Sequence, residues 1–334
     1  MKMFVPFVSA LALLSVSGSA MAQAVDNVPS EARAGAVTDD EAKELGEIVV
    51  TARRIGLPMW TVRRGDEGVL ILVGNIREVP EDFRWRQDAL ESAVAQVDRV
   101  LYPQEGRASP LDIMRILWRV RTIIYLPNQG SLDQVIPDED YRRLEALMAD
   151  GKNNRWRSMR PLIVAMDLAQ NKAGDNDSKD PNLEKVAGRA ARRARVQTHH
   201  IGVVRGSEVV DSLITSSPES QLPCLRAAID AAAYGSSAMA DRAEAWRRQD
   251  VRAVMGNPFD RVTDECWPWG DPRVRGRMRT EWVNAISTAI ADQGVTLAIA
   301  PVRTLGEQGG VLDMLEAQGF EIDGPEWRDD PDER

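Results

Sequence analysis

Two apolar runs far apart in the chain limit the folds that it can adopt. "VLILVGN", residues 69 to 75, and "VTLAIAPV", residues 295 to 302, are short and continuously apolar, which is the pattern of buried strands. The first run forms a predicted hairpin with "MWTVRR", because the Gly and Asp of the intervening "GDEG" suit a tight turn. Stretches such as "ALESAVAQVDRVL" and "TEWVNAISTAIADQG" repeat their apolar residues at helical spacing.

The order of these elements predicts a mixed α/β fold. Short apolar strands alternate with helices, helices dominate the middle, and a helix and an edge strand close the chain in "GGVLDMLEAQGFEI". We therefore expect a central mixed sheet covered by helices, with an N-terminal β-hairpin and a helix-rich middle. With 334 residues and 43% apolar content the chain can fill such a core. We expect one domain over residues 58–324 and a disordered tail over 325–334.

Residues 1–22 have the features of a secretory signal peptide. Lys2 precedes an apolar stretch from Phe4 to Val16, and Ala20-Met21-Ala22 provides a small-x-small cleavage site. The stretch is short for a membrane span of roughly 20 residues, so an uncleaved anchor is the alternative. We expect cleavage after Ala22, a periplasmic location, and no transmembrane segment in the mature chain.

The expected export affects the oxidation state of the two cysteines. Cys224 and Cys266 would meet an oxidising compartment, where two thiols in one domain often pair. Their sequence contexts show neither a CxxC motif nor the spacing of a metal knuckle. We therefore predict a structural disulfide.

The net charge of -9 disfavours two classes of partner. Nucleic acid and an anionic membrane surface would be repelled by the protein as a whole, although local basic patches such as "GRAARRARVQ" can be exceptions. That run is typical of a helix with arginines on its solvated side. We expect no nucleic-acid partner.

Residues 23–57 are polar and acidic and should form a flexible arm, which "EIVVTARR", residues 47–54, interrupts. Its strand-forming residues have no partner strand within the arm and could add to an exposed sheet edge. The segment resembles the TonB box of outer-membrane TonB-dependent transporters, which implies the C-terminal domain of TonB as a partner. The alternative is an edge strand on the protein's own sheet. The candidate partner-binding residues are Glu47, Ile48, Val49, Val50, Thr51 and Ala52.

From residue 58 to 324 the order of motifs resembles the TraB/PrgY/GumN family, which is related to the Tiki metalloproteases. The matches include the tryptophan-bearing hairpin, the apolar strand followed by "VP", "LPNQGSL", "EAWRRQD", "RMRTEW" and the closing "RTLGEQGGVLDMLEAQGFEI". The family's hallmarks are two G-x-x-H motifs, a glutamate and an arginine, thought to converge on a metal-dependent hydrolytic site. The resemblance therefore implies where such a site would lie.

The hallmark positions that can be aligned are replaced in this chain. The first motif reads Gly74-Asn75-Ile76-Arg77, so its histidine has become Arg77. The second reads Ala300-Pro301-Val302-Arg303, so it has lost both hallmark residues. The glutamate of the family's "GLE" turn falls on Val204, the glutamate that usually ends a strand falls on Pro103, and Arg277 and Arg279 lack the usual spacing of the family arginine.

An arginine cannot replace a histidine as a metal ligand, because its guanidinium stays protonated and has no lone pair to donate. The only two histidines, His199 and His200, are adjacent, so on a strand they would point to opposite faces. We therefore expect no metal, no cofactor and no catalytic residues of the family type, as in a pseudoenzyme. The alternative is a periplasmic metal-dependent hydrolase, or peptidase, with a site rebuilt from Asp and Glu.

Arg77 and Arg303 are candidates for binding an anion. The resemblance implies that they lie at the ends of neighbouring strands, where together with Gly74 they would form a cationic pocket for a carboxylate or phosphate group. The alternative is that each arginine pairs with a nearby acid, such as Glu78 or Glu307. The sequence thus predicts an exported, non-catalytic protein that acts by binding an anionic small molecule, a TonB-type partner, or both.

Overall fold

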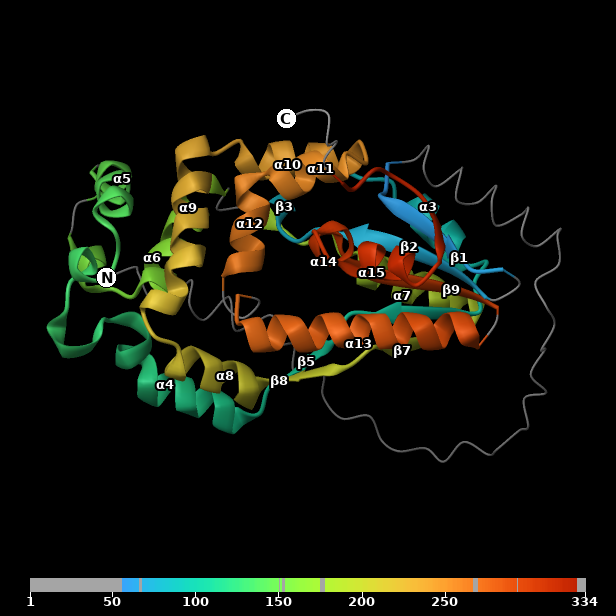
Figure 1. Ribbon diagram of the computed structural model, residues 1–334, viewed down its shortest axis with the longest axis horizontal. Coiled ribbons are helices and arrows are strands. Elements are labelled where there is room, and N and C mark those ends of the chain that lie inside the picture. The colour runs from blue at the N-terminus through green and yellow to red at the C-terminus, as the bar shows by residue number, and fades with distance from the viewer. Residues whose placement is uncertain are drawn as a thin grey trace.

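A six-stranded mixed sheet lies at the centre of the described part of the chain (Figure 1). The computed structural model describes residues 56–328 apart from 66–67, 150, 152–153, 175–177, 267–269 and 293. The predicted signal peptide, the predicted TonB-box-like segment and the rest of the predicted arm up to residue 55 lie outside the described residues. The strand order is β10-β1-β2-β9-β4-β7. Their bounds are β1 Met59–Arg63, β2 Val69–Asn75, β4 Arg99–Tyr102, β7 Gln197–His200, β9 Val295–Pro301 and β10 Glu321–Asp323.

The predicted hairpin is confirmed, since β1 pairs with β2 antiparallel and β10 pairs with the other edge of β1. The other neighbours, β2 with β9, β9 with β4 and β4 with β7, are parallel. Every residue of β2 is buried, as expected for a strand covered on both faces. The two apolar runs that limit the fold are therefore adjacent central strands, with Gly74 opposite Ala300.

Helices cover both faces of the sheet. Figure 1 shows α13, α14 and α15 in front of the strands and α3 and α7 behind them. Helices α10 and α11 pack against the same core, through Trp246 and Val251 among others. The bounds are α3 Gln87–Val94, α7 Leu183–Ala194, α10 Ala238–Arg247, α11 Val251–Gly256, α13 Pro272–Ala291, α14 Val302–Gly306 and α15 Val311–Ala317.

The middle of the chain adds a helical part with a second apolar core. Helix α9 lies at its centre between α6 and α12, and α4 and α8 lie side by side at its outer edge (Figure 1). Its α-helices are α4 Pro110–Ile124, α5 Asp138–Met148, α6 Pro161–Leu168, α8 Gly206–Thr215, α9 Leu222–Tyr234 and α12 Pro258–Glu265. Short helical turns are η1 Pro127–Gln129, η2 Leu132–Gln134, η3 Arg155–Ser158, η4 Ala169–Ala173 and η5 Glu219–Gln221. The helix-rich middle is thus as predicted.

Two small sheets lie where the chain passes between the central sheet and the helical part. Strand β3, Val79–Pro80, pairs with β6, Ser178–Lys179, and β5, Glu105–Arg107, pairs with β8, Val203–Arg205. Strands β5 and β8 lead the chain from the central sheet to α4 and α8, and β6 leads it from η4 back to α7.

Residues 325–328, expected to begin a disordered tail, pack against the folded part instead. Trp60 Nε1 donates to the carbonyl of Pro325 over 2.9 Å, and Trp327 Nε1 donates to Asp313 over 3.0 Å. Arg328 forms an ion pair with Asp313 at 2.8 Å. Among the described helices, none is long and apolar enough to cross a membrane.

Candidate functional site

Arg77 and Arg303 come from neighbouring strands. Arg77 follows β2 by two residues, and Arg303 is the second residue of α14, directly after β9. Because β2 and β9 are parallel and in register, both arginines lie at the same edge of the sheet. They line one pocket with a volume of about 100 Å³. The remaining residues around this pocket, called the edge pocket below, come mainly from α12, α13 and α14.

Gly74 does not line the edge pocket and has a packing role. A Cβ added to it would lie 2.8 Å from Val302 Cγ2 and 3.2 Å from the ring of Trp60. The carbonyl of Gly74 accepts a hydrogen bond from Trp246 Nε1 over 2.8 Å. The glycine that the family motif retains here thus lets α14 begin close against β2.

Arg303 is paired with an acid, but that acid is neither Glu78 nor Glu307, the two that the sequence suggested. Its Nε donates to Asp260 Oδ2 over 2.7 Å, and its Nη2 donates to the carbonyl of Met255. Glu307, four residues from Arg303, forms an ion pair with Arg279 instead. The guanidinium of Arg303 is therefore held against the pocket wall by α12.

Arg242, which the sequence analysis did not single out, lies behind the site. Its side chain is 1% exposed, and Nη1 lies 3.4 Å from Asp260 Oδ1. Its Nη2 donates to the carbonyl of Arg77 and, over 2.6 Å, to that of Glu78, whose φ is +54°. Arg242 thereby fixes the turn that carries Arg77. A sequence signal existed, since position 242 falls on the same helix face as the apolar Met239 and Trp246.

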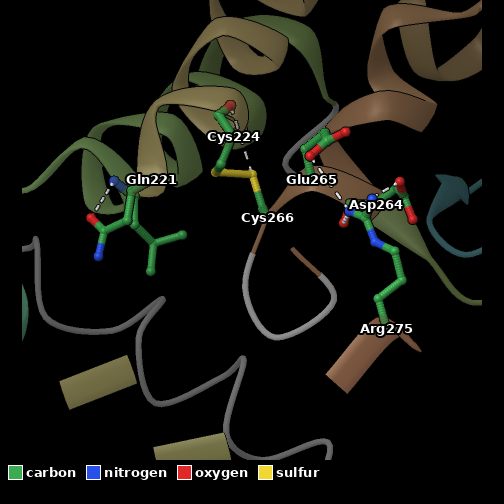
Figure 2. The surroundings of a disulfide bond; sticks show 7 residues. Gln221, Cys224, Asp264, Glu265, Cys266 and Arg275 are labelled. Atoms are coloured by element: carbon green, nitrogen blue, oxygen red, sulfur yellow. Dashed lines mark hydrogen bonds and ion pairs between the residues drawn. A yellow bond between two sulfur atoms is a disulfide. The ribbon is translucent and has the colours of Figure 1, made fainter. Parts of the chain in front are cut away.

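Helix α13 contributes two more arginines. Arg279 pairs with Glu307, and Arg275 lies 3.3 Å from Asp264 and 3.4 Å from Glu265. Figure 2 shows Arg275 reaching these two acids at the end of α12. Burial raises the pKa of the Asp264 carboxyl to about 6, although Arg275 and Arg303 act in the opposite direction.

Glu184, from the first turn of α7, completes the charged lining of the edge pocket. Loss of hydration raises the pKa of its carboxyl, and the positive charge of Arg77 is the largest opposing influence. Glu184 and Arg77 therefore interact across the pocket. The edge pocket is lined by Arg77, Arg275, Arg279 and Arg303 together with Glu184, Asp260, Asp264 and Glu307.

Three buried polar atoms of the lining have no hydrogen-bond partner in the described part of the chain. They are Asn75 Oδ1, Gln104 Oε1 and Arg279 Nε, and Asn75 is only 8% exposed. A buried polar atom without a partner is costly and is usually satisfied by a ligand, an ion or water. Two acceptors and one donor on residues of the pocket lining therefore lack a hydrogen-bond partner among the described residues.

This donor set does not fit the metal that the family hallmarks imply. Each carboxylate of the lining faces a guanidinium, which is a permanent competitor for any cation. Among the described residues, no group of three or more His, Cys, Asp and Glu side chains is arranged to hold a metal ion. No catalytic step through a metal follows from these residues.

The other aligned family positions are not brought together here. Pro103 lines the edge pocket, but Val204 is buried in β8 opposite Gly106 and does not line it. His199 and His200 end the edge strand β7 and are exposed. The ring of His200 contacts Tyr102, and its Nδ1 lies 2.8 Å from the carbonyl of Pro103.

The structure joins Cys224 of α9 to Cys266 in a disulfide (Figure 2). Cys266 directly follows α12, which carries Asp260 and Asp264. Because the bond ties the end of α12 to the centre of the helical core, it restrains the helix that supplies two of the four acids of the edge pocket.

The mixed sheet, with its helical part inserted between the strands, carries a charged pocket at the ends of β2 and β9. The family model of the TraB/PrgY/gumN family matches residues 58–323, and the chain belongs to this family. Neither a curated protein nor a solved structure matches the chain.

Proposed function

We propose that the protein is an exported, non-catalytic member of its family that binds a small anionic ligand in the edge pocket. The observation that carries the proposal is the set of unpartnered buried groups, Asn75 Oδ1, Gln104 Oε1 and Arg279 Nε, beside the guanidinium groups. An arginine binds a carboxylate or phosphate through paired N–H donors. The two amide oxygens favour a ligand that also carries a hydroxyl or amine donor.

The arginines also argue against a rebuilt hydrolase. Such a site would need several carboxylates free to converge on one cation. Here Asp260 is held by Arg242 and Arg303, and Glu307 by Arg279, so these acids already neutralise guanidinium groups. Metal analysis of the purified protein tests this directly, because a stoichiometric metal would contradict the non-catalytic proposal. The Arg77→His, Arg303→His double variant, assayed for metal and peptidase activity, asks whether the family chemistry can be restored.

Anion binding should strengthen as the pH falls through about 6. Asp264, with its pKa raised to about 6, interacts with the charges of Arg275 and Arg303 and partly neutralises them when ionised. Protonation removes that negative charge and leaves the pocket more positive. Asp264→Asn should therefore bind anions at pH 7 about as well as the unaltered protein does at pH 5.

The direct experiment is calorimetric titration with a panel of small hydroxy-carboxylates, amino-carboxylates and phosphate esters. Arg77→Gln should weaken binding about tenfold or more, because it removes a charge-assisted contact. Arg84→Gln is the matched control, since Arg84 is exposed in the loop that follows and does not line the edge pocket. Equal affinities for the two variants, or no binding by any panel member, would contradict the proposal.

The proposed TonB-type partner rests on the sequence of residues 47–54. In support, the segment combines strong strand formers with a polar arm. A peptide of residues 40–56 should bind the C-terminal domain of TonB, and Val49→Pro should abolish binding by removing a ladder donor. Protection of these amides from exchange in the isolated protein would favour pairing with a sheet edge of the protein itself.

Export to the periplasm is supported by the leader sequence and by the disulfide, a bond that persists in oxidising compartments. Expression of the full chain in a Gram-negative host, followed by fractionation and mass spectrometry, should yield a periplasmic product that begins at Gln23. A cytoplasmic product that retains Met1 would refute export.

A further inference from the structure

Helix α4 presents an apolar surface to solvent. The large hydrophobic residues that are exposed in the described part of the chain lie, with Tyr234 as the exception, between residues 111 and 125. Trp118 is 82% exposed, Leu111 74% and Leu117 57%. Isolated exposed hydrophobic residues are ordinary, but a cluster of this kind marks an interaction site.

The cluster has helical periodicity. Leu111, Met114, Leu117 and Trp118, called the α4 face below, recur at spacings of three and four residues and so share one side of α4. The opposite side of the helix is buried through Ile116 and Ile123. Figure 1 shows α4 at the outer edge of the helical part, with α8 along one side. Because Trp118, Leu111 and Leu117 are each more than half exposed, the α4 face is a projecting ridge and does not line a groove.

The charge beside the α4 face is positive. Helix α4 contains Arg115, Arg119 and Arg121, all exposed. Its single acid, Asp112, is buried and forms the N-terminal capping box with Ser109. Arg115 pairs with Asp211 of α8, whereas Arg119 and Arg121 form no ion pair within the described residues. An apolar ridge flanked by arginines thus stands out from a chain whose net charge is -9.

We propose that the α4 face binds the surface of anionic phospholipid membranes. An interfacial helix buries its apolar side about 5–10 Å into the headgroup and acyl boundary, and Trp is favoured at headgroup level. Arg119 and Arg121 then contact lipid phosphates. The acids elsewhere on the protein oppose binding weakly, because charges beyond about 10 Å are largely screened at 0.1 M salt.

A second copy of the chain fits this surface less well. Pairing two α4 faces would bring the arginines of both copies together, and the helix offers no exposed acid to neutralise them. A projecting ridge also lacks the recess into which interface anchors usually insert. An anionic membrane surface has neither disadvantage, because it neutralises the arginines and can deform around a projecting ridge.

Co-sedimentation of the full chain with lipid vesicles tests the proposal. The protein should bind mixed phosphatidylglycerol–phosphatidylcholine vesicles, lose binding at high salt, and leave pure phosphatidylcholine largely unbound. Trp118→Ala should weaken binding about tenfold or more through lost apolar burial. The double variant Arg119→Gln, Arg121→Gln should weaken it about 30-fold.

Matched controls separate the α4 face from general properties of the surface. Tyr234→Ala removes an exposed aromatic side chain from α9, and Arg192→Gln with Arg193→Gln removes two exposed arginines from α7. Both should bind vesicles like the unaltered protein, with unchanged circular dichroism. No binding to anionic vesicles, or equal losses in the controls, would overturn the proposal. A dimer in sedimentation velocity that Trp118→Ala abolishes would overturn it in favour of a second copy.

Discussion

The substitution Arg242→Met tests whether the buried arginine of α10 holds the edge pocket together. Methionine fills much of the same volume but removes every donor. Asp260 would lose its buried partner on α10 and keep only Arg303, and the carbonyls of Arg77 and Glu78 would each lose a hydrogen bond. The contact between the Arg242 guanidinium and the ring of Phe259, whose centroid lies 4.9 Å from Cζ, would also be lost.

The expected loss is large because the site is dry. The side chain of Asp260 is only 7% exposed, so its carboxylate cannot regain full hydration once Arg242 is replaced. Breaking one member of a buried ion pair costs about 3–5 kcal/mol, and the loss is nearer the lower value if Arg303 compensates Asp260. For a folded part of this size that corresponds to a fall of roughly 5–9 °C in the unfolding midpoint.

Urea and thermal unfolding followed by circular dichroism measure the change. Arg247→Met is the matched control, because it makes the same substitution on the same helix where the ion pair with Glu244 is half exposed and contributes little. The unfolding midpoint of Arg242→Lys should lie between those of Arg242→Met and Arg247→Met, because one ammonium group cannot contact Asp260 and both carbonyls at once. If Arg242→Met unfolded at the same midpoint as Arg247→Met, the assigned role of Arg242 would be wrong.

Three further results are expected. The pKa of Asp264 rises from 3.8 to about 6 on folding, so ionisation of this carboxyl opposes the folded state. The free energy of unfolding should therefore fall as the pH rises from about 4 to 6. In urea titrations across this range, Asp264→Asn should remove about 3 kcal/mol of that fall. Replacing Cys224 and Cys266 by alanine opens a loop with a sequence separation of 42 and should cost about 4 kcal/mol, with reduction of the unaltered protein giving a similar shift. Gly74→Ala should cost about 1–3 kcal/mol through its clash with Val302, and adding Val302→Ala should recover part of it; no recovery would assign the cost to another contact.

Local pattern predicted the fold well where apolar periodicity was strong. The hairpin of β1 and β2, the strand β9 and the closing α15 and β10 all follow runs whose burial agrees with their sequence. The packing of residues 325–328 was not predicted, because Trp327 and Arg328 lie in an acidic, proline-bearing segment without periodicity. Their order comes from contacts with Asp313, which belongs to α15 and lies next to them only in the folded chain.

The site was predictable only in part. The family resemblance led to Arg77 and Arg303, and their shared edge follows from the strand order. Asp260, Arg275 and Arg279 reach the same pocket from α12 and α13, and nothing in their local sequence shows where those helices lie against the sheet. The partner of Arg303 was misjudged for this reason, since Glu307 is nearer in sequence while Asp260 is nearer in space.

The pairing of β2 with β9 also determines when the protein can fold. Their partnered residues lie more than two hundred positions apart, so the centre of the sheet cannot form until nearly the whole chain is available. Before that moment β2 presents an unpaired apolar edge, whereas the second core, built mainly by α4, α5, α6, α8, α9 and α12, can assemble from closer contacts. A nascent chain halted before β9 would therefore hold a helical intermediate with an open strand edge, the form most in need of a chaperone.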